Sequence, residues 1–190
     1  MQPARVQNQF FKEFQEVIER TIKVKWTKAQ DKALDSIKKY LSVVESLPTD
    51  GSNTLETTIA LTEAGAHYET VHDAILEFES IIAEMKARRN EWKAQYGNSK
   101  RHDVLSRGSY DLECSIADSL NVMDNLIDGY TQEATLKLFL LEGLHEKIDV
   151  FTGNTYYIAW KNETYRLAAH TMMDRVLSLD QLIQYKKPVS

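Results

Sequence analysis

Two Glu-x-x-His motifs are the residues of this sequence whose types and spacing could do chemistry. One lies in YETVH, with Glu69 and His72, and the other in LEGLH, with Glu142 and His145. In helical bundles, such a motif on each of two helices, with one further Glu from each of two more, binds a pair of metal ions. Glu113 could supply one of those further ligands. These residues define one hypothesis for the protein, a di-metal carboxylate enzyme.

The predicted orientation of the first motif argues against a shared metal site. The segment Leu61–Tyr96 repeats apolar residues at steps of three and four, and this stripe defines its buried face. At 100° per residue, Glu69 points roughly 160° away from Val71 of the stripe, and His72 roughly 100° away. We therefore expect both side chains at the surface. His145, in the apolar run LKLFLLEGLH, is expected to be a buried histidine with a satisfied hydrogen bond, and no cofactor is expected.

Composition favours one all-helical domain spanning residues 1–190. Apolar residues make up 43% of the sequence, enough to bury a core, and three prolines and seven glycines interrupt it rarely. A single cysteine, Cys114, cannot form an internal disulfide or a cysteine metal cluster. No segment approaches the roughly 20 apolar residues that a membrane span needs. We expect a soluble, cytoplasmic protein without a membrane partner.

Clusters of turn-forming residues divide the sequence into five predicted helices. Their approximate bounds are 9–47, 54–96, 109–127, 132–150 and 155–185. Asn53 and Glu56 have the spacing of a helix N-terminal cap. Gly97, Gly129 and Gly153 stand where helices could end in a left-handed residue. All three glycines are interpreted as helix stops.

The first two predicted helices carry matching apolar stripes. The second helix has Leu61, Ala64, Tyr68, Val71, Ile75, Phe78, Ile82, Met85, Trp92 and Tyr96 in a seven-residue repeat, interrupted in polarity by Arg89. The first has Ile22, Trp26, Ala29, Ala33, Ile37, Tyr40, Val44 and Leu47. A sustained mean period of 3.5 residues is typical of coiled-coil packing. The sequence therefore predicts an elongated antiparallel bundle built on a long, coiled-coil-like helical hairpin.

Charge is arranged in blocks that support this antiparallel register. Residues 20–39 carry seven basic side chains against two acids, whereas residues 40–83 carry eight acids and no Lys or Arg. Residues 84–107 are again basic, and residues 108–150 are acidic. Folding the helices back near residues 50 and 100 sets opposite charges beside one another, although each exposed pair contributes only ~0–1 kcal/mol. The blocks are interpreted mainly as contacts within the bundle.

A second alternative is a nucleic-acid-binding accessory protein. Six basic side chains gather near the end of the second predicted helix and in the loop after it: Arg88, Arg89, Lys93, Lys100, Arg101 and Arg107. Basic and aromatic residues together can bind single-stranded nucleic acid. The net charge of −5 and the absence of a recognised motif weigh against that function.

The favoured function is recognition of another protein. The last predicted helix is expected to expose Tyr156, Tyr157, Trp160, Tyr165, Met172 and Met173 around more than one face, and such residues are common interface anchors. Two apolar faces imply burial twice, once within the monomer and once against a partner or a second copy. We therefore expect a non-catalytic adaptor or self-associating module. Its predicted contact residues are these aromatic side chains and the six basic ones.

Overall fold

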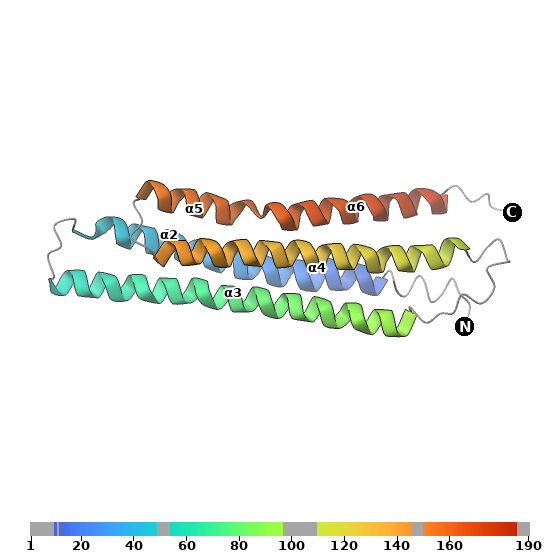
Figure 1. Ribbon diagram of the computed structural model, residues 1–190, viewed down its shortest axis with the longest axis horizontal. Helices are drawn as coiled ribbons and strands as arrows, with labels where there is room; N and C mark the ends of the chain where they lie inside the picture. Colours follow the sequence, from blue (N-terminus) through green and yellow to red (C-terminus); the bar gives the residue numbers. More distant parts are fainter. Residues whose placement is uncertain (1–9, 11, 49–53, 97–109, 146–149, 186–190) are drawn as a thin grey trace. The chain divides into compact units, whose positions relative to one another are not determined.

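The computed structural model describes residues 10, 12–48, 54–96, 110–145 and 150–185. Within these ranges it describes all side chains except 110–115, 118, 145, 150, 151 and 175–185. The regular structure of this part of the protein is entirely helical (Figure 1). The elements are η1 (Glu16–Ile22), a π-helix, and the α-helices α2 (Lys23–Ser46), α3 (Leu55–Tyr96), α4 (Tyr110–His145), α5 (Val150–Asn162) and α6 (Thr164–Tyr185). The predicted all-α bundle is confirmed.

No helix among the described residues combines the length and apolar character needed to cross a membrane.

The protein divides into two compact units, each assembled from separate stretches of sequence. Unit 1 comprises Met1–Lys23, Ile82–Thr131 and Thr164–Ser190, and unit 2 comprises Val24–Ile81 and Gln132–Glu163. Helices α3 and α4 therefore each contribute one part to unit 1 and another to unit 2.

Unit 2 is a bundle of four helical segments, from α2, α3, α4 and α5. Its α2 and α3 segments are antiparallel, because Trp26 contacts Phe78 near one end and Tyr40 contacts Tyr68 toward the other. Between these contacts Lys32 forms a 3.1 Å ion pair with Glu77, as the charge blocks predicted. The coiled-coil geometry of the hairpin remains a prediction.

Unit 1 has an aromatic core at one end and polar contacts between its helices. Phe10 packs edge-on against Trp92 and Tyr96, and Phe14 stacks at a tilt on Trp92. This pairing sets the N-terminal segment antiparallel to the end of α3. Burial raises the pKa of Tyr96 above its usual value, with a smaller contribution from Glu13.

The predicted stripes correspond to the observed core except toward the ends of α2 and α3 that the turn joins. On α3, Ala64, Val71, Ile75, Phe78, Ile82, Met85, Trp92 and Tyr96 are buried and Tyr68 is half-buried. Leu61, however, is 53% exposed, so its place in the buried stripe was wrong. Val44 and Leu47 at the end of the α2 segment are also only half-buried. The core of unit 2 thins toward the turn that joins α2 and α3.

The predicted helix stop at Gly129 was wrong, because α4 runs through it without interruption. A Cβ added at Gly129 would lie 2.6 Å from the Cβ of Ala169 and 3.0 Å from the carbonyl oxygen of Tyr165. The glycine is therefore explained by the close approach of α4 and α6 within unit 1. It does not terminate a helix.

The predicted stop at Gly153 was also wrong, because this residue lies inside α5. The interruption falls instead between α5 and α6, at Glu163, which has a φ of 43°. A residue in the left-handed conformation can end a helix whether it is Glu or Gly, although this backbone conformation is energetically less favourable for Glu. Glu163 accepts a hydrogen bond from the indole Nε1 of Trp26, which holds it in place.

At the start of α3 the observed cap is Thr54, whose Oγ1 accepts a 3.2 Å hydrogen bond from the Thr57 backbone N–H. Asn53 and Gly97 lie outside the described residues, so their predicted roles stay predictions.

Candidate functional site

One side of α3 in unit 2 presents apolar side chains on the face turned away from the core. At 100° per residue, Leu55 points roughly 180° and Ile59 roughly 140° away from the buried Ala64. Leu55 is 77% exposed and Ile59 is 59% exposed. We call this surface the outer face of α3 and define it by exposed residues that point away from Ala64: Leu55, Thr58, Ile59, Thr62, Gly65, Ala66, Glu69, Asp73 and Leu76.

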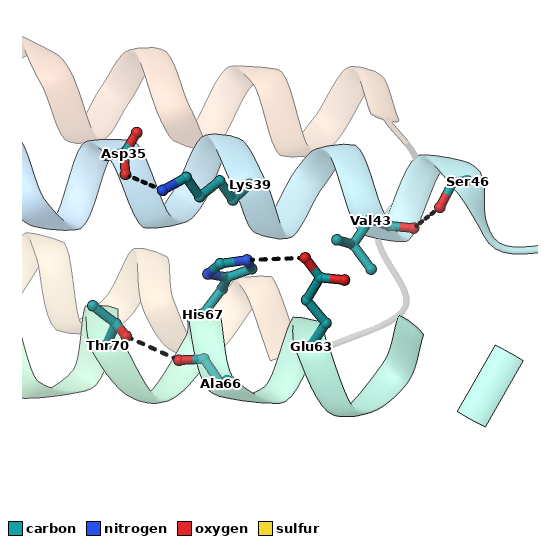
Figure 2. Close-up of polar contacts among 8 residues, drawn as sticks. All are labelled: Asp35, Lys39, Val43, Ser46, Glu63, Ala66, His67 and Thr70. Carbon is teal, nitrogen blue, oxygen red and sulfur yellow. Dashed lines mark hydrogen bonds and ion pairs between the residues drawn. The ribbon is translucent and has the colours of Figure 1, made fainter. Parts of the chain in front are cut away.

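The threonines make this face less polar than its sequence indicates. The hydroxyl of Thr58 donates to the carbonyl oxygen of Thr54 at 3.2 Å, and that of Thr62 to the carbonyl of Thr58 at 2.9 Å. Thr70 makes the same contact with Ala66, as Figure 2 shows. A hydroxyl bonded to the carbonyl four residues earlier is already satisfied. The methyl groups of Thr58 and Thr62 therefore add to the apolar surface.

Gly65 lies in the middle of the outer face with open space beyond it. A Cβ added there would meet nothing within 4 Å. Gly in an exposed helix interior costs about 1 kcal/mol relative to Ala. Unlike Gly129, Gly65 therefore has no close neighbour among the described residues that would require a glycine.

Acidic side chains continue the outer face along the helix. Glu69 and Asp73 are exposed and form no ion pair with any residue that the structure describes. Other polar groups nearby are engaged within their own helices: Glu63 lies 3.7 Å from His67, and Asp35 pairs with Lys39 at 2.6 Å (Figure 2). The hydrogen bond from Lys39 lowers the pKa of Asp35 below its ordinary value. The α3 segment of unit 2 contains no Lys or Arg.

The aromatic residues predicted to bind a partner differ in accessibility. Trp160 is fully buried, so the expectation that it is exposed was wrong; the same correction applies to Met173. Tyr156 is half-buried with its ring against Gly143, and the half-buried Tyr157 lies beneath the Lys38 ammonium, 5.5 Å from its ring centroid. Tyr165 is 44% exposed. Leu167 and Met172 on α6 are exposed as well.

The basic residues of the predicted contact surface are partly engaged inside unit 1. Arg89 donates two 2.7 Å hydrogen bonds to the carboxylate of Asp124 on α4, which raises the pKa of the guanidinium. Arg88 pairs at 3.1 Å with Glu91 of its own helix, and Lys93 is exposed. Lys100, Arg101 and Arg107 lie outside the described residues.

The residues of the metal hypothesis are not brought together where their side chains are described. Glu69 and His72 are exposed, as predicted, and Glu142 is exposed as well. The side chains of Glu113 and His145 lie outside the described part of the protein. Among the described residues there is no group of three or more His, Cys, Asp or Glu side chains that could hold a metal ion.

Unit 2 buries a charged pair that the sequence did not reveal. Lys137 and Glu133, one turn apart on α4, are both fully buried, with 3.4 Å between Nζ and Oε1. The Lys137 Nζ also donates a 2.6 Å hydrogen bond to the carbonyl oxygen of Trp160. That oxygen accepts a second hydrogen bond, of 3.0 Å, from the Gln30 side chain. The Lys137 ammonium lies 5.9 Å from the Phe78 ring centroid.

These contacts supply hydrogen-bond donors to a backbone carbonyl at the C-terminal end of α5. Trp160 lies in the last turn of α5, where carbonyls lack their usual intrahelical partners and carry partial negative charge. A cation and an amide directed at one such carbonyl cap the C-terminal end of α5. Because the ammonium is fully buried and directed at this carbonyl, we interpret Lys137 as structural.

Unit 1 buries a second polar pair, between α4 and α6. The Tyr130 hydroxyl lies 2.9 Å from Nε2 of His170, and both side chains are buried. Burial lowers the pKa of His170, and the positive charges of Arg166 and Lys23 lower it further against the opposite effect of Glu19 and Asp174. The histidine is therefore held mainly neutral at pH 7.

The sequence contains a signal for the outer face, separate from the buried stripe. Leu55 and Ile59 are four residues apart, so they share one side of the helix, and neither belongs to the buried stripe. Counting apolar residues opposite the stripe would have found them. For Lys137 no signal was available, because a lysine in an apolar run has the same pattern whether it is buried or snorkels to the surface.

Comparison with known proteins gave no match to a family model, to a curated protein or to a solved structure. The function is therefore argued from the geometry of the protein itself.

Proposed function

We propose that the protein is a non-catalytic interaction module that binds a partner protein through the outer face of α3. The observation that carries this proposal is the exposure of Leu55 and Ile59 on the side of α3 opposite its buried stripe. Leaving a Leu or Ile side chain exposed forgoes about 1.5–3 kcal/mol of burial free energy. A contiguous group of such residues is typical of an interaction site.

A protein fits this face better than the other macromolecules. Glu69 and Asp73 adjoin the apolar residues, and the segment has no Lys or Arg to offset them. Such a surface repels phosphate backbones and anionic lipid headgroups. Apolar anchors beside charged residues are instead the arrangement of protein–protein interfaces.

The buried ionisable groups support a role without catalysis. Lys137 and Glu133 are enclosed in unit 2, and His170 is buried against Tyr130 in unit 1. A catalytic group must come within hydrogen-bond distance of its substrate.

Site-specific photo-crosslinking tests the proposal. Purified protein with a photoreactive amino acid in place of Ile59 is irradiated in an extract of its native host. Position 28 is the matched control, because Lys28 is also exposed on a helix of unit 2 but lies outside the defined face. We expect a discrete protein adduct at position 59 and none at position 28.

Equal labelling at the two positions, or none at either, would contradict the proposal. Position 165 extends the test to the surface predicted from the last helix, since Tyr165 is exposed there. An adduct of twice the mass of the protein would identify the partner as a second copy. The substitution Leu55→Asp, made in the protein that carries the photoreactive residue at position 59, should abolish a genuine adduct.

A further inference from the structure

The outer face of α3 has an uneven composition that defines the chemistry of what binds there. Its first part is apolar, with Leu55 and Ile59 exposed beside Thr58 and Thr62, whose hydroxyls are bonded to backbone carbonyls. Its second part is acidic, with Glu69 and Asp73 exposed before Leu76 restores an apolar group. From Leu55 to Leu76 the face extends roughly 30 Å along the helix. That length corresponds to about 20 residues of a second helix laid along it.

Negative charge on this face is not neutralised within unit 2. Of the six acids in the α3 segment of unit 2, Glu77 is paired with Lys32, and Glu63 lies near His67. Glu69 and Asp73 have no described cationic neighbour within salt-bridge distance. Uncompensated charge of one sign attracts a partner of the opposite sign and repels partners of the same sign.

Gly65 gives the face room for close backbone approach. The space beyond this residue is open, and the adjoining Ala66 is exposed and small. Small residues between larger apolar anchors let two helices approach closely at their contact. The helix bears the cost of a mid-helix glycine at a position where the described part of the protein makes no use of it.

We infer that the outer face of α3 docks a basic amphipathic helix of a partner protein. This inference rests on the proposed function and specifies its partner. Apolar side chains of the docked helix pack on Leu55 and Ile59, as the apolar seams of two packed helices do. Its Lys or Arg side chains lie against Glu69 and Asp73, and its backbone crosses near Gly65.

Two designed peptides test the chemistry of the partner. Both are amphipathic helices of about 20 residues, the length that spans the face. Both have leucines at positions i, i+3, i+4 and i+7. They differ on the polar face, where one has lysines and the other has glutamates. Calorimetric titration of the full-length protein should show at least ~10-fold tighter binding of the lysine peptide, equivalent to about 1.4 kcal/mol. Raising the salt concentration from about 50 to about 300 mM should weaken that binding several-fold.

Variants of the protein locate the binding. Leu55→Asp with Ile59→Asp should abolish binding of the lysine peptide, and Glu69→Gln with Asp73→Asn should weaken it several-fold. Leu167→Asp is the matched control, because Leu167 is nearly as exposed as Ile59 but lies on α6 in unit 1. Because every substituted side chain is exposed, we expect all variants to remain folded. Circular dichroism melting curves check this.

Equal affinity for both peptides, or unchanged affinity in the Leu55/Ile59 variant, would overturn the inference. The proposed function itself fails if position 59 gives no adduct, and this result is distinguishable from failure of the inference alone. If position 59 crosslinks to a partner but the lysine peptide does not bind, the face is an interface and its partner is not a basic helix. If a dimer is dispersed by the Leu55/Ile59 substitutions and neither peptide binds, the occupant is a second copy of the protein.

Discussion

The ammonium of Lys137 lies 2.6 Å from the backbone carbonyl oxygen of Trp160, inside the core of unit 2. The lysine belongs to α4 and the carbonyl to the last turn of α5. Because Glu163 adopts a left-handed conformation just after this turn, the carbonyl requires a donor from elsewhere in the bundle. Lys137 supplies that donor, and Glu133 balances its charge at 3.4 Å. The end of α5 and the packing of α4 therefore depend on one buried cation.

Replacing Lys137 by Met should destabilise the protein strongly. The substitution removes the cation and leaves the fully buried Glu133 without it. Removing one partner of a buried ion pair costs about 3–5 kcal/mol. Urea denaturation followed by circular dichroism measures the change. Lys32→Met, which breaks an exposed pair with Glu77, is the matched control and should cost only ~0–1 kcal/mol.

A double substitution separates the charge from the packing. Lys137→Met with Glu133→Leu removes both charges, and the replacement of a buried ion pair by apolar residues is often neutral or stabilising. The double variant should therefore recover most of the stability lost in Lys137→Met. If it is as unstable as the single variant, the contact with the Trp160 carbonyl is the dominant contribution.

Gly129 and Gly65 should respond differently to the same substitution. Gly129→Ala places a methyl group 2.6 Å from the Cβ of Ala169 and 3.0 Å from the Tyr165 backbone, so the α4–α6 contact must widen. Overpacking of this kind costs about 1–3 kcal/mol, against the roughly 1 kcal/mol that Ala gains over Gly in a helix. Gly65→Ala meets no neighbour and should stabilise the protein by up to about 1 kcal/mol.

Thermal melting of the two glycine variants checks this contrast. Gly65→Ala should raise the melting temperature and Gly129→Ala should lower it or leave it unchanged. A clear stabilisation by Gly129→Ala would mean that α4 and α6 do not approach each other as closely as the structure shows.

The fold was predictable wherever the sequence pattern was repeated many times. The stripe of α3 identified its buried face from Ala64 to Tyr96, and the charge blocks predicted a basic segment beside an acidic one, where Lys32 pairs with Glu77. The helix boundaries inside the second half were not predictable. Glycine at a helix end and glycine at a close helix contact look alike in one sequence, so Gly129 was taken for a stop.

The candidate site was predictable only in part. Surface positions of Glu69 and His72 followed directly from helical geometry. The burial of Trp160 did not, because an aromatic residue is suited equally to a core and to an interface. Lys137 was the least predictable residue, since burial of its charge depends on Glu133, Gln30 and a carbonyl from three separate helices. Such convergence cannot be read from local spacing.

The ion pair of Arg89 with Asp124 should show measurable coupling although it is partly exposed. Two 2.7 Å hydrogen bonds join the guanidinium to the carboxylate, a geometry that lysine cannot reproduce. A double-mutant cycle with Arg89→Ala and Asp124→Ala should give a coupling energy of about 1 kcal/mol. The pair between Arg88 and Glu91, exposed on one helix, should give no more than about 0.5 kcal/mol. Equal values for the two cycles would contradict the structure.

His170 should make the stability of the protein fall in mild acid. Burial, together with Arg166 and Lys23, lowers its pKa in the folded state below the ordinary value of 6.5. The unfolded protein therefore binds this proton more readily, and the free energy of unfolding rises with pH up to and somewhat beyond 6.5, then levels off. One such group contributes a slope of at most about 1.4 kcal/mol per pH unit.

The substitution His170→Gln isolates this contribution. Glutamine can still hydrogen-bond the Tyr130 hydroxyl but does not titrate, whereas Glu19, Asp174 and the remaining histidines are unchanged. Urea denaturation between about pH 5 and 7.5, a range that spans the ordinary histidine pKa, should therefore give a shallower pH dependence in the variant than in the wild type. The difference between the two stabilities should change with pH, because protonation penalises only the histidine. Parallel curves would show that His170 titrates alike in the folded and unfolded states, which its burial against Tyr130 does not allow.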